Sequence, residues 1–255
     1  MKQGVLIPVY NHGKTALSMT ERLAAMGLPI ILVDDGNNEE TKGYLAQAAA
    51  VSSLVSLVTL PRNCGKGRAV SAGIDRAHEL GLTHILQIDA DSQHDEGRIP
   101  FFLEQARLCP GILICGYPEF DASAPVSRVT GRKIANTWSR IVTLSGDVRD
   151  AMCGFRVYPV EAARRILHRN YFDPRMGFDI EILVRLSWEG IPSLYYPVKV
   201  IYPKDGFSNF HLVQDNARIT WVFTRLFLGM LLRLPVLLYR RRQPLRKRMG
   251  GGVDG

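Results

Sequence analysis

The chain has 255 residues, with 32 Lys and Arg against 24 Asp and Glu, which gives a formal net charge of +8. Hydrophobic residues make up 46% of the chain and can form a full core, which excludes a protein that is mainly disordered. Four cysteines without a C-x-x-C pair exclude a disulfide scaffold and a zinc site built from thiolates, so we expect a reducing, cytosolic compartment. The length suits a single large α/β domain.

The excess positive charge lies at the C-terminal end. Residues 1–215 carry 23 basic and 23 acidic side chains, whereas residues 216–255 carry nine basic and one acidic. Such a basic segment can meet nucleic acid, an anionic membrane or neither. The first eight residues lack the apolar core of a secretory signal, so no export is expected.

Short apolar runs alternate with helix-like segments over the first ninety residues. Runs rich in Val, Ile and Leu predict strands at 4–9, 29–34, 53–60 and 83–89. Segments rich in Ala, Leu, Glu and Arg predict helices at 14–26, 39–50 and 66–80. This order is typical of an α/β fold with a parallel sheet and right-handed crossovers. We therefore expect functional groups to gather at the carboxyl ends of the strands.

The second half of the chain is less regular. Helices are predicted near 127–145, 160–169 and 177–188, and strands near 111–116, 155–159 and 193–201. A long helix is predicted from about residue 210 into the 230s. The expected organisation is one domain over 1–210, a helix over 211–242 and a basic, flexible tail over 243–255.

The strongest local motif is Asp89-Ala90-Asp91, which directly follows the fourth predicted strand. Two carboxylates at this spacing can converge on one hard divalent cation, Mg²⁺ or Mn²⁺, whose other ligands are water and phosphate oxygens. Gln93 can add a neutral oxygen to the same site, and His94 is expected beside it or in solvent. The alternative is an exposed acidic turn without a ligand.

Two further motifs suit a nucleotide. Asp34 and Asp35 end the second predicted strand, where a carboxylate can accept hydrogen bonds from a ribose or a base. The alternative is a turn in which the carboxylate caps the next helix. Lys66 lies between two glycines and can bring a cation and close backbone amides toward phosphates, or it simply begins a helix. Neither an ordinary P-loop nor a G-x-G-x-x-G spacing is present.

The order of motifs along the chain resembles that of one known family. The motifs are Pro8-Val9-Tyr10-Asn11, Val33-Asp34-Asp35-Gly36, Asn63-Cys64-Gly65-Lys66-Gly67, Asp89-Ala90-Asp91-Ser92-Gln93-His94, Cys153-Gly154-Phe155-Arg156 and Gly177-Phe178-Asp179-Ile180-Glu181. Over about residues 3–210 they resemble family 2 glycosyltransferases of the GT-A fold, nearest to the dolichyl-phosphate mannose synthase-like branch. The resemblance implies a Rossmann-like, mostly parallel sheet flanked by helices.

The resemblance also implies an inverting transfer of a sugar from a UDP- or GDP-linked donor, with a role for each matching residue. The donor would be held by Pro8, Tyr10, Asn11, Asp34, Asp35, Lys66, Asp89 and Ala90. The divalent metal would be held by Asp89, Asp91 and Gln93. The catalytic residues would be Asp150 and Glu181, near the sugar and the acceptor, and Lys66, near the donor.

The chain departs from the family pattern at several positions. His12 stands where Glu is usual, and Gly116-Tyr117-Pro118 stands where members with phosphate acceptors tend to have Gly-x-Arg. A basic residue of the next helix can replace the missing Arg. The candidates are Arg128, Arg132 and Lys133.

Two consequences concern the chemistry of the site. Cys153 replaces a small hydroxyl residue of the family and is expected to be a buried thiol, not a nucleophile. An anionic phosphate acceptor needs no general base, whereas a hydroxyl acceptor needs one, such as Asp150. The sequence leaves both acceptors open.

The C-terminal apolar run at 219–239 is long enough to cross a bilayer, at about 1.5 Å per helical residue. Arg225 and Arg233 make spanning costly, at about 2.5–3.5 kcal/mol each near the bilayer centre. The polar residues of the region share a helical arc of roughly 80°. They are His211, Asp215, Arg218, Arg225, Gly229 and Arg233. We expect an amphipathic helix on an anionic membrane surface; the alternative is a helix packed on its own domain or on a partner subunit.

The sequence thus predicts a glycosyltransferase that moves a sugar to a lipid-linked acceptor, either a polyprenyl phosphate or a lipid hydroxyl. It is expected in the cytoplasm, bound peripherally to the inner face of the membrane. One alternative is a non-catalytic nucleotide-sugar or membrane-surface binding protein, which the intact D-x-D motif disfavours. No nucleic-acid motif accompanies the basic tail, and Asn11-His12-Gly13 is a poor match to the loop of a nucleotidyltransferase.

Overall fold

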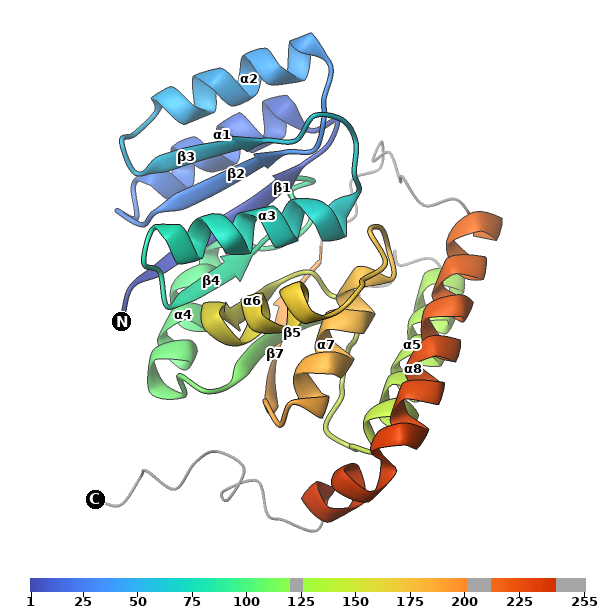
Figure 1. Cartoon of the computed structure of the whole chain (residues 1–255). Helices are drawn as coiled ribbons and strands as arrows, with labels where there is room; N and C mark the ends of the chain where they lie inside the picture. The colour runs from blue at the N-terminus through green and yellow to red at the C-terminus, as the bar shows by residue number, and fades with distance from the viewer. Residues whose placement is uncertain (120–125, 201–211, 242–255) are drawn as a thin grey trace, which may run out of the picture.

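The computed structural model describes residues 1–119, 126–200 and 212–241, and its centre is a seven-stranded sheet (Figure 1). The strands are β1 (Gln3–Val9), β2 (Ile30–Asp34), β3 (Val55–Thr59), β4 (His84–Gln87), β5 (Leu113–Glu119), β6 (Arg156–Pro159) and β7 (Ser193–Lys199). Their order across the sheet is β3-β2-β1-β4-β6-β5-β7. The pairs among β1 to β4 are parallel, as predicted, and β5 pairs in parallel with β7. Strand β6 runs antiparallel to both of its neighbours.

Helices cover both faces of the sheet. One face carries α1 (Gly13–Ala24), α2 (Glu39–Ala50) and α4 (Ile99–Leu108), and the other carries α3 (Lys66–Glu79), α6 (Val160–Arg169) and α7 (Phe178–Trp188). Alternate strand residues supply the two cores, because successive side chains of a strand point to opposite faces. In β1, Val5 and Ile7 pack in the core under α1 and α4, while Leu6 packs in the core under α3.

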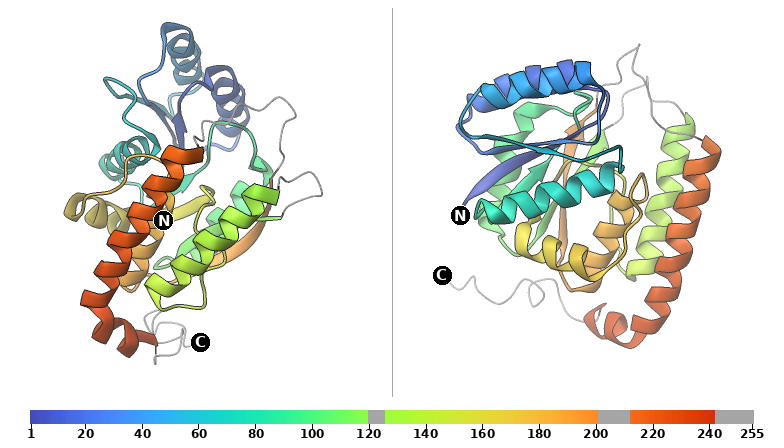
Figure 2. Two further views of the ribbon diagram at one scale, coloured as in Figure 1. Left: turned by 90° about the vertical axis from the view of Figure 1, so that its right-hand side faces the viewer. Right: turned by 45° about the horizontal axis from the view of Figure 1, so that its top comes forward.

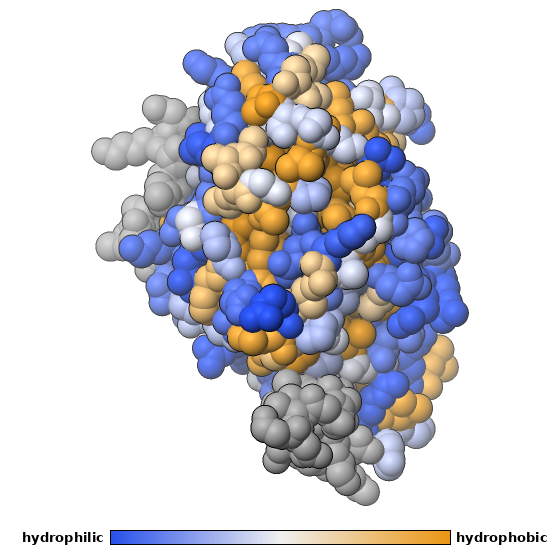
Figure 3. Space-filling model, turned by 90° about the vertical axis from the view of Figure 1, so that its left-hand side faces the viewer, coloured by the Kyte–Doolittle hydropathy of each residue, from blue (hydrophilic) through white to orange (hydrophobic). Residues whose placement is uncertain are grey.

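Two long helices, α5 (Val126–Thr143) and α8 (Leu212–Arg241), lie side by side next to α7 (Figures 1 and 2). The ring of Trp138 on α5 lies 6.3 Å from that of Phe223 and 6.5 Å from that of Phe227 on α8. On the outward side of α8, apolar side chains such as Leu232 are exposed. On the opposite side of the molecule, hydrophobic patches are interrupted by hydrophilic side chains (Figure 3).

The predicted strands and helices are all found within the described residues, with shifted bounds. Strand β4 ends at Gln87 instead of residue 89, so Asp89 lies just beyond the sheet. Helix α4 was not predicted; it follows a short 3₁₀ turn and carries Pro100 in its first turn, where the missing N–H of proline costs no hydrogen bond. The predicted tail at 243–255 and His211 lie outside the described residues.

Candidate functional site

The loops after β1 and β2 are tied together by the buried side chain of Asn37. Its amide nitrogen donates to the carbonyl oxygen of Val9 at 2.8 Å and to Asp34 Oδ1 at 2.7 Å. Its amide oxygen accepts from the backbone N–H of Asn11 at 2.7 Å. Asn11 has a φ of 62°, a left-handed conformation that asparagine tolerates. Two predicted donor-binding residues, Asn11 and Asp34, are therefore fixed at the same edge of the sheet.

Asp35 connects the end of β2 to the loop before α3. Its carboxylate accepts from the backbone N–H of Cys64 at 2.7 Å and from that of Gly65 at 2.9 Å. Burial raises the pKa of Asp35, and the two amides oppose that rise. Next to it, Gly36 has a φ of 68°, and a Cβ there would lie 2.0 Å from the carbonyl carbon of Arg62. Asp35 thus holds the loop that leads to Lys66, and its contact with a donor stays a prediction.

The other predicted donor residues near β1 have simpler surroundings. Pro8 lies within β1, opposite Val33 of β2. Tyr10 follows the strand and is exposed, so its ring is open to a ligand. Ala90 is buried between the two carboxylates of the D-x-D motif. All of them lie on or next to the carboxyl ends of parallel strands, as the sequence predicts.

Lys66, the first residue of α3, is the centre of a charged cluster. Its Nζ donates to Asp89 Oδ2 at 2.9 Å and to Asp179 Oδ2 at 2.8 Å. Burial lowers the pKa of Lys66, but the attraction of Asp179 and Asp89 outweighs it and raises that pKa above its ordinary value. The ammonium therefore stays charged. Asp179 Oδ1 is buried and has no hydrogen-bond partner among the described residues, so it can accept a bond from a ligand.

Gly154 brings the backbone of the next loop against this cluster. Gln87 of β4 pairs with Arg156 of β6. Because these strands are antiparallel, Asp89, two residues after Gln87, lies beside Gly154, two residues before Arg156. A Cβ at residue 154 would lie 2.7 Å from both Asp89 Oδ2 and Lys66 Nζ. Any larger residue would displace one of these charged groups.

The pKa values of the two D-x-D carboxylates, Asp89 and Asp91, shift in opposite directions. Burial raises the pKa of Asp89, but Lys66, His94 and Gln87 together more than offset this and the net shift is downward. Burial and the like charge of Asp89 both raise the pKa of Asp91. Asp91 Oδ1 accepts from the backbone N–H of Gln93 at 3.0 Å; a role for the Gln93 side chain as a metal ligand stays a prediction.

These residues fit a divalent cation that is completed by a donor. Among the described residues, no group of three or more His, Cys, Asp or Glu side chains is placed to hold a metal ion by itself. Two carboxylates are nonetheless the hard oxygen ligands that Mg²⁺ and Mn²⁺ prefer, and a diphosphate and water can supply the rest. Asp89 and Asp91 would hold such an ion.

Asp150 organises the loop that leads to Gly154. Its Oδ1 accepts from the Arg132 guanidinium at 2.7 Å and from the backbone N–H groups of Met152 and Cys153 at 2.9 and 2.7 Å. The pairing brings Arg132 of α5 to the site. Of the other basic candidates, Lys133 is exposed, and the side chain of Arg128 lies outside the described residues.

Cys153, which precedes Gly154, is a buried free thiol. Burial raises its pKa to about 12, so it is protonated at neutral pH and does not act as a nucleophile. This agrees with the interpretation of the sequence.

Glu181, predicted to be catalytic, is fully buried. Its Oε1 accepts from Arg185 at 2.7 Å, and its Oε2 accepts from Arg225 at 3.0 Å and from the backbone N–H of Asp173 at 2.9 Å. Both oxygens are therefore occupied by protein groups. This geometry favours a positioning role for Glu181 over contact with a substrate.

Sequence reasoning missed Asn37 and Asp179. A signal for Asp179 was available, because residues two apart on a helix point in nearly opposite directions. Asp179 and Glu181 cannot both face Lys66, and the structure places Asp179 there. Asn37 lies three residues after Asp34 in a turn, a position typical of side chains that bond to nearby backbone.

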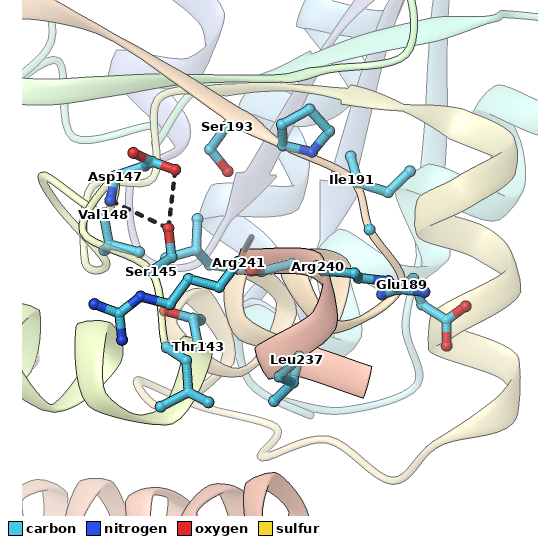
Figure 4. Close-up of a pocket in the computed structure, with 15 residues that line it drawn as sticks. Thr143, Ser145, Asp147, Val148, Glu189, Ile191, Ser193, Leu237, Arg240 and Arg241 are labelled. Carbon is cyan, nitrogen blue, oxygen red and sulfur yellow. Dashed lines mark hydrogen bonds between the residues drawn. The ribbon is translucent and has the colours of Figure 1, made fainter. Parts of the chain in front are cut away.

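A separate cavity of about 280 Å³ lies at the C-terminal ends of α5 and α7 (Figure 4). Ser145, Asp147, Glu189 and Arg240 are among the described residues that line it, and none of the residues predicted for the site does. The hydroxyl of Ser145 contacts Asp147 Oδ2 at 3.0 Å and so occupies that carboxylate. The cluster around Lys66, where the predicted residues gather, is the candidate active site.

Two solved structures share the fold of this chain. Glucosyl-3-phosphoglycerate synthase from Mycobacterium tuberculosis, in complex with Mn²⁺, UDP-glucose and phosphoglyceric acid, has a TM-score of 0.59 and 18% identity and covers 98% of this chain and 80% of its own. S. aureus TarS 1–349 in complex with UDP-GlcNAc has a TM-score of 0.60 and 12% identity, with coverages of 94% and 72%. They confirm the predicted GT-A fold.

Curated relatives carry names of lipid-phosphate sugar transferases. A dolichyl-phosphate beta-glucosyltransferase from Trichomonas vaginalis is 26% identical over 201 residues, which are 70% of this chain and 58% of that protein. An undecaprenyl-phosphate 4-deoxy-4-formamido-L-arabinose transferase from Pectobacterium atrosepticum is 32% identical over 180 residues, 67% of this chain and 53% of that protein. An undecaprenyl-phosphate mannosyltransferase from Micrococcus luteus is 24% identical over 214 residues, with coverages of 82% and 87%.

The chain spans little more than half of the length of several curated relatives, between 53% and 58%. The family assignment rests on a separate comparison with a family model. The model described as Glycosyl transferase family 2 matches residues 4–167, which include β1 to β4, the Lys66 loop, the D-x-D motif and Gly154. Because this match covers more than half of the sequence, the chain belongs to glycosyl transferase family 2.

Proposed function

We propose that this protein transfers a sugar from a nucleotide-diphosphate donor to a polyprenyl phosphate, with inversion at the anomeric carbon. The observation that carries the proposal is the cluster in which Lys66 contacts Asp89 and Asp179 at the carboxyl edge of the sheet. Departure of a nucleoside diphosphate builds up negative charge, and a fixed cation at this edge stabilises it. The names of the relatives support a lipid phosphate as the acceptor.

The donor half of the proposed site lies after β1, β2 and β4. Asn11 and Asp34, held together by Asn37, would bind the nucleoside. Asp89 and Asp91 would hold Mg²⁺ or Mn²⁺, which neutralises the diphosphate when bound. Lys66 would stay protonated through the reaction, because the carboxylates beside it raise its pKa.

The acceptor half would lie toward α5. Arg132 is the basic residue of that helix that the Asp150 ion pair brings to the site, and a guanidinium suits a phosphate. Asp150 Oδ1 accepts from Arg132 and from the backbone N–H groups of Met152 and Cys153, and so holds Arg132 in place. A guanidinium held there suits an anionic phosphate acceptor, which needs no general base, better than a lipid hydroxyl.

A transfer assay tests the proposal. The purified full chain is incubated with Mn²⁺ or Mg²⁺, with undecaprenyl phosphate or its dephosphorylated alcohol, and with UDP-glucose, UDP-GlcNAc or GDP-mannose in turn. We expect a lipid-linked product with the phosphate acceptor and with at least one donor. Product with the alcohol alone would contradict the acceptor, and donor binding without turnover in every combination would favour the non-catalytic binding protein.

We also propose that α5 and α8 dock this enzyme on an anionic membrane. The two helices carry four and five basic residues and a single acidic one, Asp215. The outward side chains are large and apolar, and among the described residues α8 is long and apolar enough to cross a membrane by length and composition. Exposed members of this docking face include Ile134, Trp138, Ile141, Trp221, Leu228 and Leu232. An apolar face with basic neighbours is typical of helices that lie in the headgroup region.

The docking face can be tested with one substitution and a matched control. Leu232 is 84% exposed, so Leu232→Glu should leave the fold intact and weaken flotation with phosphatidylglycerol vesicles about tenfold, since inserting a leucine gains about 1.5–3 kcal/mol. Leu108→Glu, at an exposed leucine on α4, should float like the wild type. High salt should release part of the wild-type protein. Equal flotation of the two variants would contradict this docking face.

A further inference from the structure

The side of α8 that packs on the protein is mainly apolar, and at its margin Arg225 pairs with a buried carboxylate. Arg225 Nη2 donates to Glu181 Oε2 at 3.0 Å, and the Glu181 side chain is fully buried. The guanidinium of Arg225 also lies 5.3 Å from the centre of the Tyr171 ring. Glu181 also accepts from Arg185 of its own helix at 2.7 Å, so Arg225 is the partner that ties this buried carboxylate to α8. The pair therefore fixes how α8 sits on α7.

Glu181 in turn holds the loop that precedes α7. The same oxygen, Oε2, accepts from the backbone N–H of Asp173 at 2.9 Å. The Asp173 carboxylate closes the loop, because it accepts from the backbone N–H groups of Arg175 and Gly177 at 3.0 Å each. Residues 173–177 thus form a loop that is closed by the Asp173 carboxylate and held at Asp173 by Glu181.

This loop lies directly against the first turn of α3, which carries Lys66. The backbone N–H of Gly67 donates to the carbonyl oxygen of Pro174 at 2.9 Å. A Cβ at Gly65 would lie 2.3 Å from that same oxygen, and a Cβ at Gly67 would lie 2.8 Å from the carbonyl oxygen of Asp173. The two segments are in contact on both sides of Lys66, so a movement of the loop moves the lysine.

We propose that Arg225 is a positioning residue for the active site. Through Glu181 and the 173–177 loop, it sets the place of Lys66 between Asp89 and Asp179. Trp221 and Leu228 of the docking face lie about one turn before and one turn after Arg225, so the docking face and the charged cluster are linked through this contact. The inference deepens the proposed function and rests on it for its kinetic test.

The kinetic test compares Arg225→Gln with Arg233→Gln. Arg233 lies two turns further along α8 and contacts the Trp188 ring and the Gly229 carbonyl, not Glu181. With the donor and acceptor that the wild type uses, we expect Arg225→Gln to lower kcat about tenfold or more at a temperature well below unfolding, and Arg233→Gln to stay within about twofold. Arg225→Lys, which keeps the charge, should recover part of the loss. Equal kcat values for the two glutamine variants would overturn the proposal.

A second measurement does not depend on turnover. Hydrogen exchange of the amides at 65–68 and 173–177 should be about tenfold faster in Arg225→Gln than in Arg233→Gln, because Glu181, which holds the loop, loses one of its two arginine partners. Unchanged exchange in both segments would overturn the positioning role even if no donor were turned over. Absence of transfer by the wild type, with the expected exchange pattern, would instead contradict the proposed function and leave the link from Arg225 to Lys66 standing.

Discussion

Replacing Asp91 with Asn should lower metal-dependent sugar transfer about a hundredfold or more, which corresponds to about 2.7 kcal/mol of transition-state stabilisation. The substitution keeps an oxygen that accepts from the backbone N–H of Gln93, so the turn after β4 is preserved. It removes one of two negative charges that would hold the cation beside the diphosphate. Turnover should be measured over a titration of Mn²⁺, and the concentration for half-maximal rate should rise.

Asp95→Asn is the matched control for this substitution. Asp95 lies four residues further along the same segment, and its Oδ1 accepts from the backbone N–H of Gly97 at 2.9 Å, a bond that asparagine also makes. We expect near-wild-type rates and metal dependence for this variant. If Asp91→Asn were as active as Asp95→Asn, the assignment of the metal to the D-x-D motif would be wrong.

Replacing Gly154 with Ala should also cost about a hundredfold in turnover, although it adds a single methyl group. The new Cβ would lie 2.7 Å from Asp89 Oδ2 and from Lys66 Nζ, so one of the two must move. The φ of Gly154 lies outside the left-handed region, so the expected effect comes from this contact and not from backbone strain. A displacement of about 1 Å in a catalytic group can cost two orders of magnitude in rate.

Gly43→Ala separates this effect from a general intolerance of alanine. Gly43 lies in α2, and a Cβ there would meet no atom within 4 Å. The change should leave turnover unaltered and stabilise the helix by about 0.5–1 kcal/mol, measured by thermal unfolding. Full activity of Gly154→Ala would show that the charged cluster accommodates the methyl group and that the close approach of residue 154 is not needed for catalysis.

The first half of the fold was predictable because its strands are parallel and three of them, β1, β2 and β4, are mostly buried on both faces. Such strands are continuous apolar runs, and the polar residues that follow them must lie together at one edge. This places Asn11, Asp34 and Asp89 at the same edge without knowledge of the structure. The sequence also showed Lys66 between two glycines, but it did not show that this lysine pairs with Asp89 and Asp179.

Other features depend on contacts between segments far apart in the sequence. The sequence predicts an amphipathic α8 but not which side faces the protein: Arg225 and Arg233 were expected on a polar surface, and the structure turns both toward α7. Helix α8 therefore packs on its own domain, which was the alternative interpretation, and it also exposes apolar side chains outward. In the same way, the buried Glu181 side chain bonds to Arg225, which lies 44 residues away along the chain, and to the backbone of Asp173, which lies eight residues away.

The reversed direction of β6 changes which part of the chain can build the catalytic edge. In a wholly parallel sheet, the segment that enters a strand lies at the far edge, away from the site. Because β6 is antiparallel to β4, its entering segment, with Asp150 and Gly154, arrives next to Asp89. The part of the connection from α5 to β6 that precedes Asp150 can therefore change in length or sequence without rerouting any crossover helix. Diversity on the Arg132 side of the site can arise there while the nucleotide half stays the same.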